Sequence, residues 1–161
     1  MNPRLPIFVS YAHKDVFYLE NLLNHLTPLK MQNQVCAWSD KDIEPGSNWS
    51  NGISTSIVNA RVCVLLISKN FLASEFIRNR EIPQMLDRKD KNKILPIIVG
   101  PCLLDLAEFK YPDPELGPNT FHLSSIQALN DPNKPISSLS ESEQDIIYVK
   151  AAKTLYQLWK R

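Results

Sequence analysis

Short apolar runs alternate along the chain with longer segments in which apolar residues recur every three or four positions. Five runs are short and rich in aliphatic or aromatic residues, which is typical of β-strands. They cover residues 5–10, 34–38, 61–68, 92–100 and 120–124. The third run, RVCVLLIS, is almost unbroken in its aliphatic character, and such runs occupy the centre of parallel sheets. Pro96 in the fourth run predicts an edge strand or a bulge, because proline cannot donate to the sheet ladder.

Helices are predicted between the first three runs. We expect Asp15 to cap the first helix and Pro28 to mark its end. Its apolar face follows the helical period at Leu19, Leu22, Leu23 and Leu26. A second helix is expected to start near Ser47 or Asn48, with Trp49, Ile53, Ile57 and Ala60 on its apolar side.

The second half of the chain is more broken by proline. A third helix is predicted over residues 74–88, where Pro83 must kink or divide it. The segment 101–119 contains four prolines and a glycine, which predicts an irregular excursion over much of its length. Ser140 and Glu143 form a capping box, so a last helix is expected from that point.

Strands that alternate with helices predict right-handed crossovers and a parallel sheet covered on both faces. We therefore expect a flavodoxin-like three-layer α/β fold with a central five-stranded parallel sheet and helices on both faces. The length fits a single domain over residues 1–161. Ligands of such sheets bind outside the carboxyl ends of the strands, where the loops after strands one, two and three converge.

Charge and composition narrow the choice of partners. Eighteen basic and seventeen acidic residues leave a net charge of +1, so no global field favours nucleic acid or an anionic membrane. The first residues lack the apolar stretch of a signal peptide, and no run is long enough to span a bilayer, which predicts a cytoplasmic protein. The cysteines are odd in number, which argues against a disulfide scaffold. Only four glycines are present, and they form neither a dinucleotide fingerprint nor a P-loop.

Three segments resemble sequence blocks of the Toll/interleukin receptor (TIR) family in its bacterial form. Residues 7–15, IFVSYAHKD, resemble the first box of the family. Residues 38–49, WSDKDIEPGSNW, resemble the loop between the second strand and the second helix. Residues 68–82 resemble the segment that carries the glutamate of NAD-cleaving members. The three blocks occur in the family's order on the expected elements.

The resemblance implies an NAD+ glycohydrolase that breaks the bond between nicotinamide and ribose without a metal or a cofactor. Glu81 is then the catalytic residue, because a carboxylate can hold ribose hydroxyls and oppose the positive charge of an oxocarbenium-like transition state. The expected substrate-binding residues are Ser10, Tyr11, His13, Asp42, Phe76 and Ile77. Ile77 departs from the family pattern, since many NAD-cleaving relatives have tryptophan there. Phe76, one position earlier, is a candidate for the missing ring.

Family members also assemble through the loop after the second strand, which makes Ile43, Glu44, Pro45 and Gly46 the expected self-association loop. Other TIR domains and a fused or separate sensor domain are the implied partners, in a defence effector activated by oligomerisation. In the main alternative, the fold is a signalling adaptor that recruits TIR domains while Glu81 is idle. A third possibility is a protein that makes or senses a nucleotide signal.

The residues also have plainer interpretations. Glu81 could be a surface glutamate beside two half-exposed aliphatic residues, and His13 could be simply exposed. Asp42 fits a role in shaping its loop as well as one in binding substrate. Trp38 and Trp49 are expected to be packing anchors at the two ends of that loop.

Overall fold

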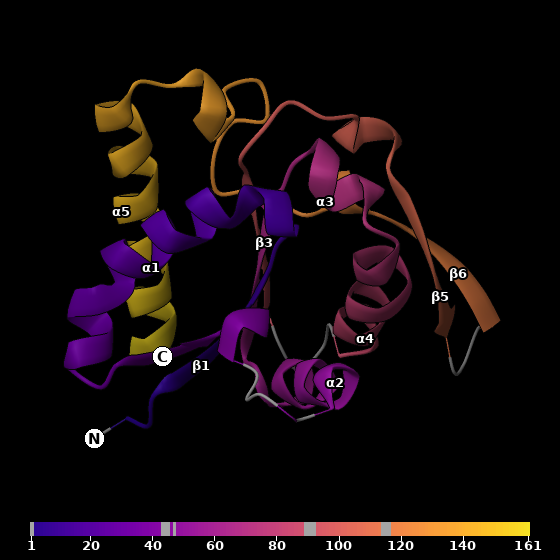
Figure 1. Cartoon of the computed structure of the whole chain (residues 1–161), viewed down its shortest axis with the longest axis horizontal. Helices are drawn as coiled ribbons and strands as arrows, with labels where there is room; N and C mark the ends of the chain where they lie inside the picture. Colours follow the sequence, from indigo (N-terminus) through magenta and orange to yellow (C-terminus); the bar gives the residue numbers. More distant parts are fainter. Residues whose placement is uncertain (1, 43–45, 47, 89–92, 114–116) are drawn as a thin grey trace.

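A parallel sheet divides the protein into layers (Figure 1). The computed structural model describes residues 2–42, 46, 48–88, 93–113 and 117–161. The sheet has the strand order β2-β1-β3-β4 and every neighbouring pair is parallel. Its strands are β1 (Leu5–Ser10), β2 (Val35–Trp38), β3 (Val62–Ile67) and β4 (Lys93–Ile98).

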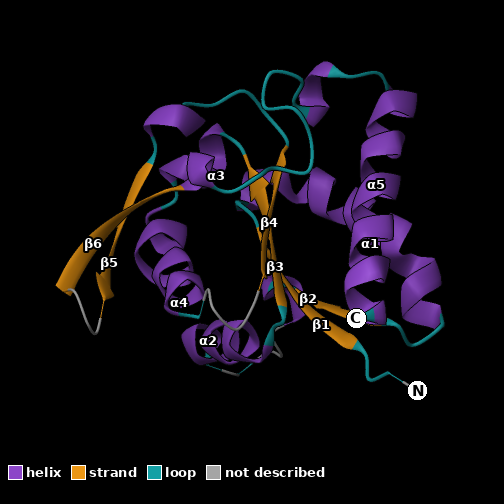
Figure 2. Cartoon of the chain, turned by 180° about the vertical axis from the view of Figure 1, so that it is seen from behind, coloured by secondary structure: helices purple, strands orange, loops and turns teal. Residues whose placement is uncertain are grey.

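Helices cover both faces of this sheet, as the two opposite views show (Figures 1 and 2). One face carries the long helices α1 (Val16–Met31) and α5 (Glu141–Lys160). The other carries α2 (Trp49–Asn59), α3 (Lys69–Ala73) and α4 (Ile82–Asp87). The predicted three-layer α/β fold is therefore confirmed.

Strand β3 shows why the sheet needs two layers of helices. All six of its residues are buried, as the aliphatic run predicts for a central strand. Val64 and Leu66 belong to the core beneath α1 and α5, while Leu65 and Ile67 belong to the core beneath α2 and α4. This alternation follows from the two-residue period of a strand. Pro96 lies on β4, which is one of the two edge strands of the sheet, as expected.

The prediction of a fifth parallel strand is wrong. Strand β6 (Gly117–His122) pairs antiparallel with β5 (Glu108–Asp113), and this separate hairpin packs outside α4 (Figure 1). The segment 101–119 is thus more regular than predicted. Pro112 and Pro118 face each other across the ladder. Both strands of a two-stranded ribbon are edge strands, and edge strands tolerate residues that cannot donate a hydrogen bond.

Helix α1 ends three residues later than predicted, because Pro28 lies inside it. The actual stop is Asn33, whose φ of 58° is left-handed. The amides of Asn33 and Gln34 donate to the carbonyls of Lys30 and Leu29, which is the Schellman arrangement of a helix C-terminus. Asp15 precedes the helix but makes no capping hydrogen bond.

The single helix predicted over residues 74–88 is divided. A π-helix at Ile77–Glu81 leads directly into α4, so Pro83 lies in the first turn of α4. Proline is tolerated there, since the amides of a first turn have no partner within the helix. The capping box at Ser140 and the start of α2 after Asn48 are confirmed. Within the described residues, no helix is both long and apolar enough to cross a membrane.

Candidate active site

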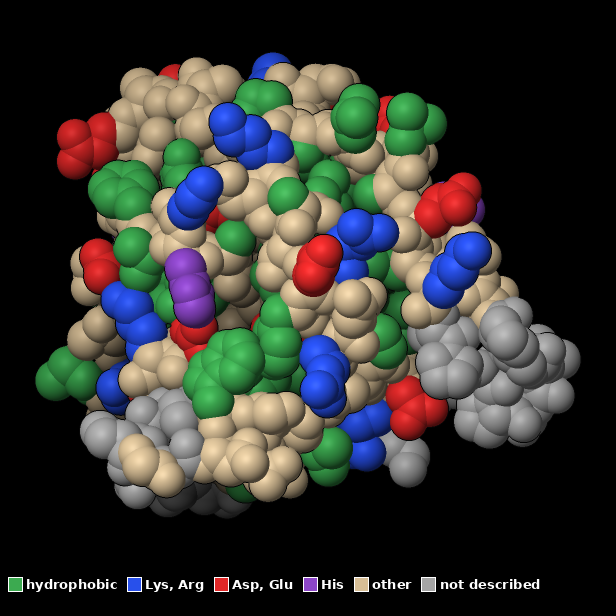
Figure 3. Space-filling model, turned by 45° about the vertical axis from the view of Figure 1, so that its right-hand side comes forward, with side chains coloured by type: hydrophobic (Ala, Val, Ile, Leu, Met, Phe, Trp, Pro, Cys, Tyr) green, Lys and Arg blue, Asp and Glu red, His purple; other side chains and the backbone are tan. Residues whose placement is uncertain are grey.

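A cavity of about 280 Å³ lies where the loops after β1 and β2 meet the π-helix. We call it the Glu81 cavity. Its lining includes the loop residues Tyr11, His13 and Asp40, the aromatic residues Trp49 and Phe76, and the carboxyl group of Glu81. The space-filling view of this side shows a hollow edged by a histidine, acidic groups and hydrophobic side chains (Figure 3). This is the edge at which open α/β sheets bind ligands.

Glu81 is only 6% exposed, yet it lines the cavity. The hydroxyl of Ser10, the last residue of β1, donates a hydrogen bond of 2.7 Å to Glu81 Oε1. Burial raises the pKa of Glu81 from 4.5 to about 7, the hydrogen bond from Ser10 opposes this rise, Asp40 adds to it, and His13 opposes it. The carboxyl group can therefore exchange a proton near neutral pH.

Asp40 joins the two loops at the mouth of the cavity. The hydroxyl of Tyr11 donates a hydrogen bond of 2.6 Å to Asp40 Oδ1, and the other carboxylate oxygen bonds His13 Nε2. Burial is the main cause of the raised pKa of Tyr11, and the bond to Asp40 contributes. Tyr11 thus stays protonated and keeps donating. The loop after β1 is fixed to the loop after β2 by one carboxylate.

Trp49 and Phe76 form an aromatic wall. Their ring centroids lie 4.3 Å apart with 40° between the ring planes. Trp49 comes from the first position of α2, and Phe76 immediately precedes the π-helix. An aromatic pair of this kind offers an apolar surface for a planar ring.

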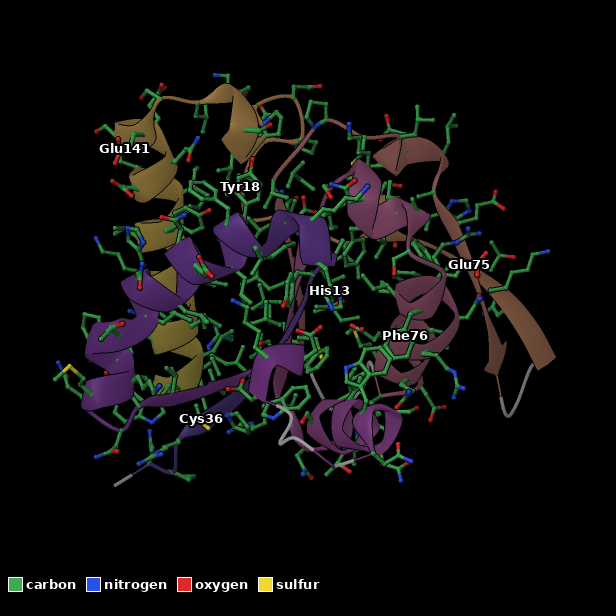
Figure 4. The ribbon with its side chains drawn as sticks, viewed as in Figure 1. His13, Tyr18, Cys36, Glu75, Phe76 and Glu141 are labelled. Atoms are coloured by element: carbon green, nitrogen blue, oxygen red, sulfur yellow. The ribbon has the colours of Figure 1, made fainter. Side chains whose placement is uncertain are left out.

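The π-helix explains how Phe76 and Glu81, five residues apart, line one cavity. The amide of Ile82 donates to the carbonyl of Ile77, a hydrogen bond that spans five residues instead of four. The wider turn brings positions five apart toward one face. Figure 4 shows the labelled Phe76 on this segment, with His13 on the opposite loop. Ile77 is buried in the core and contributes its aliphatic side chain to the lining.

The structure thus brings most of the predicted site residues together. Tyr11, His13, Phe76, Ile77 and Glu81 all line the cavity, and Ser10 lies behind Glu81 as its hydrogen-bond donor.

Asp42 is placed differently from the prediction. Its Oδ2 accepts a hydrogen bond of 2.9 Å from the amide of Ser39, and it does not line the cavity. Asp40 and Asp42 belong to one turn of 3-10 helix. The side chain of Asp40 lines the cavity, whereas that of Asp42 accepts a hydrogen bond from the backbone of its own loop. The plainer interpretation of Asp42, that it shapes the loop, fits this contact.

Three of the four residues of the expected self-association loop, Ile43, Glu44 and Pro45, lie outside the described residues. Gly46 is described and has a φ of 87°, a left-handed conformation that favours glycine. Its role in self-association stays a prediction.

Sequence reasoning missed two residues of the cavity wall. Trp49 was expected to be a packing anchor, but it is 42% exposed and lines the cavity. Trp38 does pack, with its ring stacked on Phe8 at 5.6 Å. Asp40 was not predicted as a site residue, although its position just after β2 places it at the ligand-binding edge. In the described ranges, no three His, Cys, Asp or Glu side chains gather so as to hold a metal ion.

Comparison with known proteins identifies similar sequences and folds. A sequence model described as the TIR domain matches residues 7–129. The chain is 30% identical over 104 residues to the probable 2′ cyclic ADP-D-ribose synthase TcpO of Methanobrevibacter olleyae, and 29% identical over 98 residues to the uncharacterized protein y4lF of Sinorhizobium fredii. These matches cover 64% and 60% of this chain, and each spans 30% of the relative's own length.

The structure is similar to the TIR domain of the Toll-related receptor TRR-2 from Hydra magnipapillata. The TM-score is 0.59, and the match covers 98% of this chain and 99% of that one. At 16% sequence identity, this likeness bears on the fold alone.

Proposed function

The chain belongs to the TIR domain family, and from that premise we propose that it is an NAD+ glycohydrolase, with Glu81 as its catalytic residue. The observation that carries this proposal is the buried carboxyl group of Glu81 in a cavity that also holds an aromatic wall. The name of the relative TcpO, a probable cyclic ADP-ribose synthase, points to the same substrate class.

The chemistry asks for a negative group beside the ribose. The nicotinamide nitrogen of NAD+ is positively charged, and breaking its bond to the ribose carbon releases neutral nicotinamide and moves the positive charge onto the sugar. The carboxylate of Glu81 would stabilise that charge and accept hydrogen bonds from the ribose hydroxyls. Asp40 supplies a second negative group in the same wall.

The second half of the reaction needs a proton acceptor. A water molecule that attacks the ribosyl carbon gives ADP-ribose and must lose a proton, whereas attack by a hydroxyl of the same molecule gives a cyclic product. With its pKa near 7, Glu81 can accept that proton and release it to solvent. The Trp49–Phe76 pair would stack against the nicotinamide ring and take the place of the tryptophan that many relatives carry at position 77.

Self-association and defence are part of the proposal. We place this domain in an effector that depletes NAD+ once copies assemble through the loop around Gly46. The match to each curated relative spans 30% of that relative's length.

The decisive experiment measures nicotinamide release from NAD+ by purified protein at high concentration, with and without a crowding agent. Glu81→Ala and Glu81→Gln are expected to lower the rate by a hundredfold or more, on the order of losses seen when a charge-stabilising group is removed. Glu75→Gln is the matched control, because Glu75 is an exposed glutamate on the same segment (Figure 4).

A rate unchanged by Glu81→Gln would exclude Glu81 as the catalytic residue. Self-association of the wild type without any turnover would instead favour a signalling adaptor. One feature favours that alternative specifically: Leu103 and Leu106 are largely exposed beside a cavity of about 620 Å³ that lies apart from Glu81. Exposed apolar patches of this kind mark protein interfaces.

A further inference from the structure

A third cavity, of about 390 Å³, opens at the carboxyl ends of β1, β3 and β4. We call it the Asp15 cavity. Its lining includes Asp15, Tyr18, Lys69, Gly100 and Ser137. Asn70 lines both this cavity and the Glu81 cavity, so the two lie side by side with one amide side chain between them.

The strand order makes this position a favoured ligand site. The chain passes from β1 to β2 on one side and later places β3 on the other side of β1. Strand order reverses at that point, and the crevice outside it is where open α/β sheets bind their ligands. Asp15 follows β1, while Lys69 and Asn70 follow β3. Both cavities flank the same crevice.

The Glu81 cavity is small for the proposed substrate. Cavities that enclose a whole small-molecule ligand range from about 300 to 1,000 Å³. At about 280 Å³ the Glu81 cavity suits one half of a dinucleotide. NAD+ consists of two nucleosides joined by a pyrophosphate, and two neighbouring cavities match that division.

The polar groups of the Asp15 cavity suit a ribose. Asp15 is 5% exposed, and its carboxylate accepts hydrogen bonds from the Ser68 hydroxyl and, at 3.0 Å, from Asn70 Nδ2. No lysine, arginine or histidine in the described ranges forms an ion pair with it. A carboxylate offers about four acceptor positions, so two remain for the hydroxyls of a sugar.

The remaining groups suit the base and the phosphates. The half-buried ring of Tyr18 lines the cavity and offers an aromatic surface for a purine. Two exposed lysines stand on either side of the shared amide, since Lys14 lines the Glu81 cavity and Lys69 lines the Asp15 cavity. Phe76 lines the Glu81 cavity and Tyr18 lines the Asp15 cavity, so each cavity has its own aromatic surface.

We propose that the Asp15 cavity binds the adenosine half of NAD+, with the pyrophosphate crossing Asn70 between Lys14 and Lys69. The Glu81 cavity then holds the nicotinamide riboside half. This inference rests on the proposed function, and it names the second half of the same substrate site.

Gly100 allows the Asp15 cavity to be filled selectively. A Cβ at Gly100 would meet Ser68 Cβ at 3.6 Å and Ser137 Oγ at 4.0 Å, which are ordinary contacts. A leucine there would extend into the cavity. Gly100→Leu is expected to raise the KM for NAD+ about tenfold while leaving cleavage of nicotinamide mononucleotide, which lacks the adenosine, within about twofold of wild type.

A second variant tests the same inference if Gly100→Leu does not fold. Tyr18→Ala removes the ring that would stack on adenine and is expected to raise the KM for NAD+ about fivefold, again without effect on nicotinamide mononucleotide. Tyr156→Ala is its matched control, because Tyr156 is a half-buried tyrosine of α5 whose ring contacts Trp159 and which lines neither cavity. Equal loss on the two substrates in both variants would overturn the inference.

A binding measurement separates this inference from the proposed function. Titration calorimetry with ADP-ribose needs no turnover, and Gly100→Leu is expected to weaken its binding about tenfold relative to wild type. If wild type cleaves neither substrate, the glycohydrolase proposal fails, and the Asp15 cavity is judged by this titration alone. Undetectable binding to wild type, or equal Kd values for the two proteins, would overturn the adenosine site.

Discussion

The two faces of the sheet are built in different ways. Helices α1 and α5 have 16 and 20 residues, and each has a fully formed cap, the Schellman arrangement at Asn33 and the capping box at Ser140. On the other face, α2, α3 and α4 have 11, 5 and 6 residues, and a π-helix interrupts the sequence of turns. We call the face covered by α1 and α5 the sealed face, and the face covered by α2, α3 and α4 the broken face. The Glu81 cavity lies on the broken face.

The difference shows where a cavity can form. Long helices cover a core along its whole length. Leu22 of α1 and Tyr148 and Leu155 of α5 are almost completely buried in that core. Short helices leave ends, and the side chains at these ends can turn toward a ligand. One face of the sheet should therefore carry most of the stability and the other the catalytic residue, a division that mutations can break or sharpen.

The largest expected effect is on the sealed face. Leu155→Ala removes a completely buried side chain and should lower the free energy of unfolding by about 4 kcal/mol. Nicotinamide release by the remaining folded protein should be unchanged. Urea unfolding and an activity assay below the transition measure the two quantities. Val149→Ala on the same helix is the control, since Val149 is exposed and should cost less than about 0.5 kcal/mol. A parallel fall in kcat for Leu155→Ala would contradict the division.

On the broken face, Glu81 should stabilise the fold only when it is protonated. Because its pKa in the folded protein is raised from 4.5 to about 7, the folded state holds the proton more tightly than the unfolded state does. The contribution of Glu81 to the free energy of unfolding is fully present below the unfolded pKa of 4.5 and is lost as the pH rises through 7. The change is about 3 kcal/mol.

Glu81→Gln does not titrate, so it should match wild type in acid. It should be more stable than wild type by about 3 kcal/mol near pH 8, although it releases nicotinamide at least about a hundredfold more slowly. Urea unfolding of both proteins at the two pH values gives the comparison. A stability difference that is the same in acid and in base would show that the carboxyl group is not desolvated.

Asp40 and Asp42 offer a comparison within one turn. Asp40→Asn weakens the join between the two loops and should lower kcat/KM about tenfold, or about 1.4 kcal/mol. Since the charge of Asp40 raises the pKa of Glu81, its loss should lower that pKa and move the acid limb of the pH profile to lower pH.

Asp42→Asn is the matched control, because Asp42 bonds its own loop and does not line the cavity. It should leave the acid limb where it is. A shift of equal size in both variants would mean that Asp40 acts only through the shape of the loop.

The smallest expected effect returns to the sealed face. Ser140→Ala removes the hydroxyl that accepts a hydrogen bond from the amide of Glu143, and it should lower the free energy of unfolding by about 1 kcal/mol. Activity should stay at the wild-type level. Thermal unfolding compares this variant with Ser142→Ala, an exposed serine in the first turn of the same helix that caps nothing. A change in activity on removal of this cap would show that the two faces are coupled.

The sequence predicted the sealed face and the four parallel strands well. Those elements are specified by local patterns: aliphatic runs, a leucine period and the pair Ser140 and Glu143. The end of α1 was predicted at Pro28, but Pro28 lies inside the helix and Asn33 ends it. Asparagine is among the residues that adopt a left-handed conformation most readily.

The broken face was harder to predict because its features are not local. Residues 120–124 were assigned to the parallel sheet, since a short apolar run does not reveal which strand will pair with it. The π-helix leaves no periodicity of its own over five residues. Glu81 was predicted through a family resemblance. Whether the side chains of Asp40 and Trp49 point into the cavity depends on the folded conformation of the loop between them, which the sequence pattern does not specify.

The π-helix affects how such a site can be gained or lost in evolution. One turn determines that the ring of Phe76 and the carboxyl group of Glu81 share a wall, and the decisive property of that turn is its number of residues. A one-codon deletion between these positions would close the turn to an ordinary helix and separate the pair, while α4 kept its buried side. Gain or loss of this pairing among homologues is therefore expected to follow insertions and deletions as much as substitutions.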